Sequence, residues 1–120
     1  MNLNIVTLKE NRDFKRLYAR GKSCPHPLLV TYARKNRLPF NRVGITTSKK
    51  IGNAVKRNRA RRIIREAYRS VGPGLPGGWD FVFVARFKTS KAKTQDLIPV
   101  MRKQISKLTT PLENGGVTKK

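Results

Sequence analysis

The chain has 120 residues, of which 28 are Lys or Arg and 6 are Asp or Glu, so its formal net charge is +22 at pH 7. This length predicts one domain. The single cysteine, Cys24, excludes an intramolecular disulfide and a cysteine-clustered zinc site, and it is typical of a reducing, cytoplasmic location. No secretory signal is evident, and the longest apolar run, residues 81–85, is far shorter than the roughly 20 residues that cross a bilayer.

So large a positive charge indicates a polyanionic partner. Like charges repel one another in the compact state, and a bound polyanion relieves that repulsion. Nucleic acid is the partner that we favour. An anionic membrane is the alternative, but it would require an exposed basic amphipathic helix with an apolar face of Trp, Phe or Leu.

The first half of the chain predicts one helix and two strands. Apolar residues recur at helical spacing over residues 8–20, which predicts a helix capped by Thr7 or Asn11. Residues 27–35 are rich in Leu, Val, Thr and Tyr and predict a strand, and residues 42–48 predict another. Because a turn is expected between these strands, we expect them to pair as an antiparallel hairpin.

The second half predicts two helices around one strand. Residues 53–71 form the clearest helix, with Asn53 as its cap and glycines and a proline beyond its end. Residues 80–87 are apolar on both faces and predict a central, buried strand. Residues 94–108 have helical spacing and predict a closing helix. Beyond these elements, residues 110–120 show no periodicity and predict a disordered tail.

These elements predict an α+β fold with a single two-layer domain over residues 1–109. The expected order is α-β-β-(β)-α-β-α, in which helices pack on a mixed sheet. The bracketed element is an extra short strand near Lys50. No internal repeat or second domain is expected.

The helix over residues 53–71 carries most of the concentrated charge. Nine of the 21 residues from 49 to 69 are basic, whereas only Glu66 is acidic. An ordinary solvated face mixes charges of both signs, but Arg61, Arg65 and Arg69 follow one another at a spacing where like charges repel. We therefore interpret the polar arc of this helix as a surface that binds a polyanion. This arc comprises Asn58, Arg61, Arg62, Arg65 and Arg69.

Three aromatic residues, Phe14, Tyr18 and Tyr32, are a second candidate site. Single-stranded RNA is commonly held by stacking of its bases on exposed rings beside basic groups. From spacing alone, packing in the core is the favoured interpretation of Phe14 and Tyr18. Tyr18 and Tyr32 have polar tips, so they are the better candidates for partial exposure.

Residues 42–69, RVGITTSKKIGNAVKRNRARRIIREAYR, closely resemble the signature of the bacterial ribonuclease P protein subunit. The most specific parts are KKIGNAV, RNR, and the RR and IRE that follow. Residues 12–14 with Tyr18 are similar to the first-helix aromatic pair of that family, and residues 80–86 are similar to its last strand. The resemblance spans about residues 8–108.

The resemblance implies a subunit of a ribonucleoprotein endoribonuclease that removes the 5′ leader from precursor tRNA. The RNA subunit would be the catalyst, and the protein alone would be inactive. The resemblance also implies a left-handed crossover carrying the arginine-rich helix, although right-handed crossovers are the rule. Binding of the leader in a cleft between the first helix and the sheet would raise substrate affinity. Neutralisation of phosphates where the RNA subunit and the substrate meet would lower the Mg²⁺ requirement.

By resemblance and position, two groups of residues would contact RNA. The catalytic RNA would lie against Lys56, Arg57, Asn58, Arg59, Arg61, Arg62, Arg65 and Arg69. The leader would lie against Phe14, Tyr18, Tyr32, Ser48, Lys49 and Lys50. The expected partners are thus the catalytic RNA and precursor tRNA, with no membrane and no obligatory protein partner. We expect no metal or cofactor on the protein, since Mg²⁺ would be used by the RNA subunit.

Two other function classes are alternatives. A nuclease working alone needs clustered carboxylates or paired acid-base groups, but the acids are scattered, and the one close pair, Glu10 with Asp13, fits the first turn of a helix. His26 lies between two prolines, which predicts that it is a loop residue, and Cys24 has no evident catalytic partner. A ribosomal protein or general RNA chaperone shares the size and charge, but it would show no preference for one large RNA.

Overall fold

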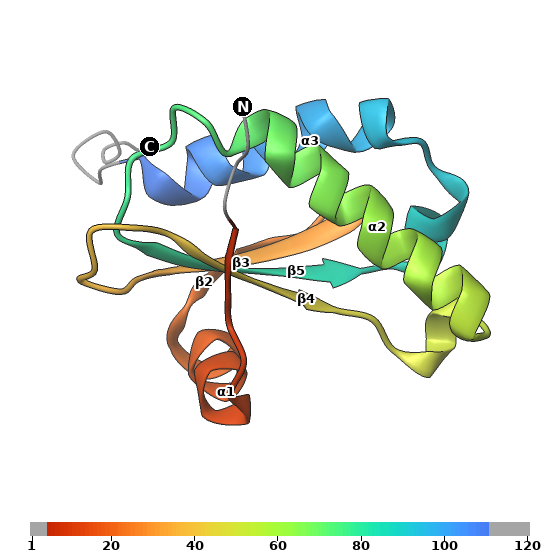
Figure 1. Ribbon diagram of the computed structural model, residues 1–120, viewed down its shortest axis with the longest axis horizontal. Helices are drawn as coiled ribbons and strands as arrows, with labels where there is room; N and C mark the ends of the chain where they lie inside the picture. Colours follow the sequence, from red (N-terminus) through yellow and green to blue (C-terminus); the bar gives the residue numbers. More distant parts are fainter. Residues whose placement is uncertain (1–4, 111–120) are drawn as a thin grey trace.

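The structure is a computed structural model that describes residues 5–110. A five-stranded sheet has the order β1-β4-β5-β3-β2. One helix, α1, covers one face of this sheet, and α2 and α3 cover the other (Figure 1). The elements are β1 (Val6–Thr7), α1 (Asn11–Arg20), β2 (Lys22–Cys24), β3 (Leu29–Lys35), β4 (Arg42–Thr46), the 3₁₀ helix η1 (Lys49–Ile51), α2 (Ala54–Val71), β5 (Trp79–Ala85), the 3₁₀ helix η2 (Phe87–Lys91) and α3 (Thr94–Thr109).

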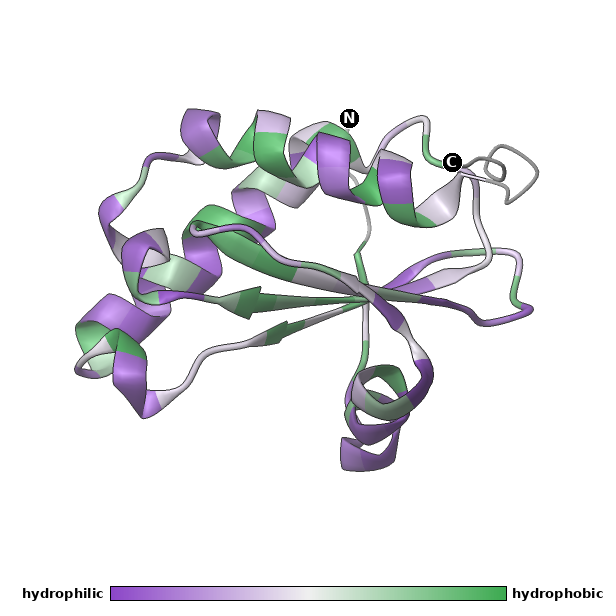
Figure 2. Cartoon of the chain, turned by 180° about the vertical axis from the view of Figure 1, so that it is seen from behind, coloured by the Kyte–Doolittle hydropathy of each residue, from purple (hydrophilic) through white to green (hydrophobic). Residues whose placement is uncertain are grey.

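The central strand β5 organises the core. It pairs in parallel with β4 and antiparallel with β3, so both of its edges are bonded. Phe81 and Phe83 are fully buried against α2 and α3, while Val82 on the opposite face packs with Leu8 and Leu17 near α1. In Figure 2 the middle of the sheet is correspondingly green, whereas much of α1 is purple. The prediction of a central strand buried on both faces is confirmed.

The predicted hairpin between β3 and β4 is wrong, because β5 lies between these strands. The loop that joins them is bonded instead to the residues that lead into β5. The backbone N–H of Asn36 donates to the carbonyl of Gly78, and the side chain of Asn41 accepts from Trp79 N–H and donates to the carbonyl of Pro76. Because β5 lies between β3 and β4, the loop has to span two inter-strand distances, which a tight turn could not do.

Several smaller expectations also change. The strands β1 and β2 were not expected, because two and three residues are too few to show a period. The segment at Lys50 forms η1 rather than a strand. Phe87, expected in the central strand, begins η2 and is 57% exposed. The residue that caps α1 is Glu10, which accepts no side-chain hydrogen bond, rather than Thr7 or Asn11.

The two long helices begin and end close to the predicted positions. The Oδ1 atom of Asn53 accepts from Lys56 N–H at 3.0 Å, which confirms the predicted cap of α2. Within α3, the buried Gln104 accepts from Thr31 Oγ1 and donates to the carbonyls of Cys24 and Leu29. These bonds tie α3 to β2 and β3. No helix within residues 5–110 is both long and apolar enough to span a membrane.

The α+β class and the mixed sheet packed by helices are therefore confirmed within the described residues, but the layers number three rather than the predicted two, because α1 lies on the face of the sheet opposite α2 and α3. A disordered tail is predicted for residues 110–120. Of these, residues 111–120 lie outside the described part of the chain.

Candidate nucleic-acid interface

The arginine-rich helix α2 is amphipathic. Its buried residues, Ala60, Ile63, Ile64, Ala67, Tyr68 and Val71, pack on the sheet and on α3. The opposite side is polar and exposed to solvent. Six of the predicted RNA-binding residues on α2 are exposed: Lys56, Asn58, Arg59, Arg62, Arg65 and Arg69.

Two arginines on the flank of α2 are partly buried and also hold the protein's own backbone. Arg61 donates to the carbonyl of Ile45 at 3.2 Å and to Thr47 Oγ1 at 2.9 Å. Arg57 donates to the carbonyl of Gly52 at 2.8 Å. A guanidinium group has five N–H donors, so each side chain retains donors for another partner. Arg61 thus lies at the side of the predicted polar arc, not at its centre.

The first turns of α2 form a shallow hollow of about 630 Å³. Val55, which lines it, is 75% exposed, and the other lining residues are Lys56, Asn58, Arg59 and Arg62. The one acidic side chain of the helix, Glu66, accepts a hydrogen bond from Thr94 Oγ1 at 3.0 Å. None of the arginines on α2 forms an ion pair with a carboxylate among residues 5–110. The basic charge of this surface is therefore uncompensated within the described part of the chain.

The predicted aromatic residues lie together on the α1 face of the sheet. The rings of Tyr18 and Tyr32 meet edge to face, with centroids 5.0 Å apart. The Tyr18 hydroxyl lies 2.6 Å from Thr46 Oγ1, and this side chain is 41% exposed. Phe14 is half-buried against the small core cluster of Leu17 and Val82. The structure thus supports both interpretations of these residues, since Phe14 packs against the core and Tyr18 also faces solvent.

The strand β4 joins the two candidate surfaces. Thr46 contacts Tyr18 on the α1 face, and the next residue, Thr47, accepts from Arg61 of α2. The predicted leader-binding residues Ser48, Lys49 and Lys50 follow directly and are all exposed. Ser48 caps η1, because its Oγ accepts from Lys50 N–H at 3.3 Å. Members of both predicted groups, Tyr18 and Arg61, are therefore hydrogen-bonded at this end of β4.

Sequence reasoning missed three residues near this end of the sheet. Two of them are Thr46 and Thr47, whose hydroxyl groups contact Tyr18 and Arg61. Nothing in their sequence spacing distinguishes them from other strand residues. Phe87 begins η2, which lies beside η1, and the ammonium of Lys91 is 4.4 Å from the centroid of its ring. Its alternation with Phe83 and Ala85 made it resemble a core residue, so only the structure reveals that it is exposed.

The remaining candidate catalytic groups are occupied by structural contacts. His26 Nδ1 accepts from the backbone N–H of Leu28 at 3.0 Å, in the loop before β3. Cys24 is a half-buried residue of β2. Within residues 5–110, no group of three His, Cys, Asp or Glu side chains is arranged to hold a metal ion.

A family model described as Ribonuclease P matches residues 4–109, which is nearly the whole chain. The chain belongs to the ribonuclease P protein family. The "Ribonuclease P protein component" of Thermoanaerobacter sp. (strain X514) is 44% identical over 115 residues, which cover 96% of this chain and 97% of that protein. The protein of the same name from Clostridioides difficile (strain 630) is 44% identical over 91 residues, covering 75% and 80%.

Solved structures of ribonuclease P proteins share this fold. The RNase P protein of Staphylococcus aureus has a TM-score of 0.76 at 30% identity, over 89% of this chain and all of that chain. The RNase P protein of Thermotoga maritima has a TM-score of 0.68 at 30% identity, over 85% and 93%. The resemblance inferred from residues 42–69 is thereby confirmed, as is the fold that it implied.

Proposed function

We propose that this protein is the RNA-binding protein subunit of a cytoplasmic ribonuclease P, which removes the 5′ leader from precursor tRNA. One surface, on α2, binds the catalytic RNA, and the other, on the α1 face, binds the leader. The observation that carries this proposal is the pair of adjacent threonines at the end of β4. Thr46 is bonded to Tyr18 of the aromatic surface, and Thr47 to Arg61 of the basic helix. Two RNAs bound to these surfaces would meet there.

The helix α2 suits a folded RNA. Its exposed arginines span several helical turns and present donors that can grip the two oxygens of one phosphate. Because no carboxylate among residues 5–110 pairs with them, binding requires no internal ion pair to be broken. Neutralising the phosphates releases their counterions, so this contact depends strongly on salt.

The surface around Tyr18 suits a single strand. Stacking of one base on an aromatic ring contributes about 1–3 kcal/mol and tolerates any base, as a variable leader requires. Tyr18 is the most accessible ring of this surface, and Lys49 and Lys50 lie close enough in sequence to Thr46 to contact the phosphates of the same strand. Affinity gained here would favour precursor over mature tRNA.

Cleavage in this proposal is performed by the RNA subunit, which holds the Mg²⁺ ions. The acidic side chains of the protein support this assignment, because four of the five within residues 5–110 are engaged elsewhere. Glu10 pairs with Arg12, Glu66 accepts from Thr94, Asp80 pairs with Arg42, and Asp96 accepts from Lys93 N–H. The protein contributes positive charge where two RNAs meet, so less Mg²⁺ is needed to screen their phosphates.

The experiment is cleavage of a precursor tRNA at low Mg²⁺ by the partner catalytic RNA, with and without the protein. Strong stimulation, together with no cleavage by the protein alone, is the expected result. A folded protein that binds many RNAs equally and gives no stimulation would favour a general RNA chaperone. Cleavage that persists after every RNA subunit has been removed would favour an autonomous nuclease.

A further inference from the structure

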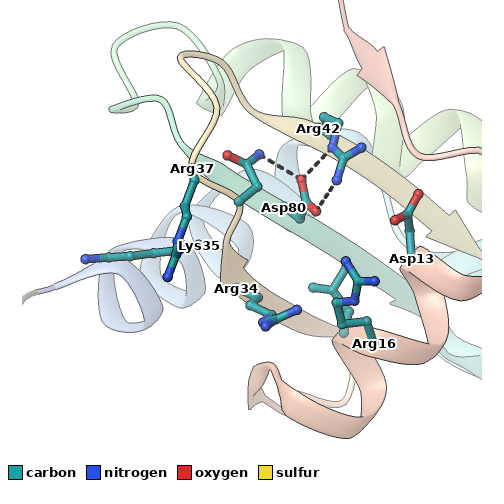
Figure 3. Close-up of a pocket in the computed structure, with 9 residues that line it drawn as sticks. Asp13, Arg16, Arg34, Lys35, Arg37, Arg42 and Asp80 are labelled. Carbon is teal, nitrogen blue, oxygen red and sulfur yellow. Dashed lines mark hydrogen bonds and ion pairs between the residues drawn. The ribbon is translucent and has the colours of Figure 1, made fainter.

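A cationic cavity lies on the far flank of α1 from the aromatic surface. On α1, Phe14 and Tyr18 lie on one side of the buried Leu17, and Asp13 and Arg16 lie on the other. The cavity has a volume of about 220 Å³ and is formed by α1, the end of β3, the following loop and the starts of β4 and β5 (Figure 3). Its lining residues are Asp13, Arg16, Leu17, Arg34, Lys35, Asn36, Arg37, Arg42 and Asp80.

One ion pair forms the neutral part of this cavity. Arg42 binds both carboxylate oxygens of Asp80, at 2.9 and 2.7 Å, and Asn36 Nδ2 donates to the same carboxylate at 2.8 Å. The hydrogen bonds that Arg42 donates to Asp80 raise the pKa of Arg42. Asp80 is only 8% exposed and already accepts three hydrogen bonds. It therefore has little capacity left to neutralise the other arginines.

The remaining charge in the cavity is positive. Five basic and two acidic side chains line it, which leaves a net charge of +3. The ion pairs within residues 5–110 are Arg12 with Glu10 and Arg42 with Asp80, so Arg16, Arg34 and Arg37 have no carboxylate partner there. Asp13 is the opposing charge, and it lies in the first turn of α1, where the helix dipole already favours it. Collecting three such cations in one hollow raises the electrostatic energy unless an anion joins them.

Arg37 is held in an unusual backbone conformation. Its φ is +62°, a left-handed value that non-glycine residues other than Asn and Asp rarely adopt. Asn36 enforces it, because its Oδ1 accepts from Leu38 N–H at 2.7 Å and its Nδ2 donates to the carbonyl of Phe40. Asn or Gly would suit this position better, so the guanidinium of Arg37 is present despite the backbone cost.

We propose that this cavity binds a phosphate group of an RNA backbone between Arg16, Arg34 and Arg37. It is a third RNA contact, separated from the aromatic surface by the width of α1 and from α2 by the thickness of the sheet (Figure 1). The inference rests on the proposed function, since the RNA is either the catalytic subunit or precursor tRNA. Non-bridging phosphate oxygens accept two hydrogen bonds from one guanidinium, and no bond is made or broken.

The decisive variant is Arg16→Gln with Arg34→Gln, and the matched control is Arg102→Gln with Lys107→Gln. Both remove two charges, but the control residues lie exposed on α3, away from the proposed contacts. One arm measures affinity for the catalytic RNA alone, and the other measures affinity of precursor tRNA for the assembled holoenzyme. Each is measured over a range of salt concentrations, so that the number of phosphate contacts can be compared.

We expect R16Q/R34Q to lose about tenfold in affinity, and about one unit of salt slope, in one arm, which identifies the RNA that supplies the phosphate. The control should change far less in both arms. If R16Q/R34Q matches the control in both arms, the cavity binds no RNA phosphate, although the proposed function stands. If the unaltered protein binds neither RNA, the proposed function itself fails.

Arg37→Asn separates RNA binding from folding. Asn tolerates a left-handed backbone, so the thermal midpoint of R37N should equal or exceed that of the unaltered protein. We nevertheless expect a loss of about fivefold in the affinity of the same arm, because a phosphate contact is removed. Affinity that stays unchanged in R37N, at equal or higher stability, would overturn the assignment of Arg37 to the cavity.

Discussion

The ring of Phe14 lies against the backbone of Gly44, so closely that a Cβ atom at residue 44 would be 2.6 Å from two ring atoms. Gly44 is a buried residue of β4, in register with Val82 of β5. The missing side chain allows α1 to approach the sheet. The position of Phe14, and with it the place of Tyr18 one turn later, therefore depends on a glycine in another element.

Gly44→Ala should displace Phe14 and lower the free energy of unfolding by about 1–3 kcal/mol, because the site has no room for a methyl group. Thermal or denaturant unfolding measures this change. Adding Phe14→Leu to Gly44→Ala should restore part of the stability, since the smaller side chain makes room. If the losses of Gly44→Ala and of Phe14→Leu alone simply added in the double variant, the ring and the glycine would not be coupled.

Tyr18 should act through its ring rather than its hydroxyl. Tyr18→Ala should reduce the preference for precursor over mature tRNA about tenfold, the effect of losing one stacked base, while affinity for the catalytic RNA stays the same. Tyr18→Phe should retain the preference, although it loses the 2.6 Å contact with Thr46. Comparison of the two dissociation constants for each variant measures the effect. A loss as large in Y18F as in Y18A would assign the role to the hydroxyl.

The arginines of α2 should divide into two kinds. Arg62→Gln with Arg65→Gln should lower the salt slope of binding to the catalytic RNA by about 1–2, with little effect on stability, because both side chains are exposed. Arg61→Gln should also lower the free energy of unfolding, by about 1–2 kcal/mol, because Arg61 holds the end of β4. Filter binding at several salt concentrations and thermal unfolding test the two effects. An unchanged salt slope in R62Q/R65Q would argue against phosphate contact there.

Alkaline pH should destabilise the fold through Tyr68. Burial raises the pKa of Tyr68 above the usual value of 10.0, because its ring is packed against Phe81 and Phe83. The unfolded chain then releases this proton at a lower pH than the folded one, so its contribution to stability is complete below pH 10 and is lost as the pH rises toward the folded pKa. Thermal midpoints between pH 8 and 11 should fall less steeply in Tyr68→Phe. Parallel pH profiles of the two proteins would contradict this.

The elements that could be predicted from the sequence are long segments with a regular hydrophobic pattern and clear capping or breaking residues at their ends. The helix α2 begins after Asn53 and ends before Gly72, as a capping residue and a breaker indicate. The order of the strands could not be predicted, because local sequence shows which residues form a strand but not which strand lies beside it. The pairing of β5 with a strand at each edge is a tertiary effect. It is favoured over the direct pairing of β3 with β4 that their short connection suggests.

The candidate site was predictable where one element carries it. The arginines of α2 are visible in one stretch of sequence, whereas the cavity beside α1 joins residues as distant as Asp13 and Asp80. The close approach of the Phe14 ring to the sheet depends on Gly44, and no spacing rule contains that information. The resemblance to ribonuclease P proteins supplied the grouping that periodicity could not.

The strand at the centre of the sheet is also the last strand along residues 5–110. Until residue 85 has left the ribosome, β3 and β4 have no common neighbour, and neither can be closed into a sheet by the other. The arginine-rich helix is synthesised before that strand, so its apolar side has no completed core to cover while its cationic side is already able to attract RNA. Folding of this chain must therefore await a late, long-range pairing, which is the slow step expected of a topology rich in distant contacts.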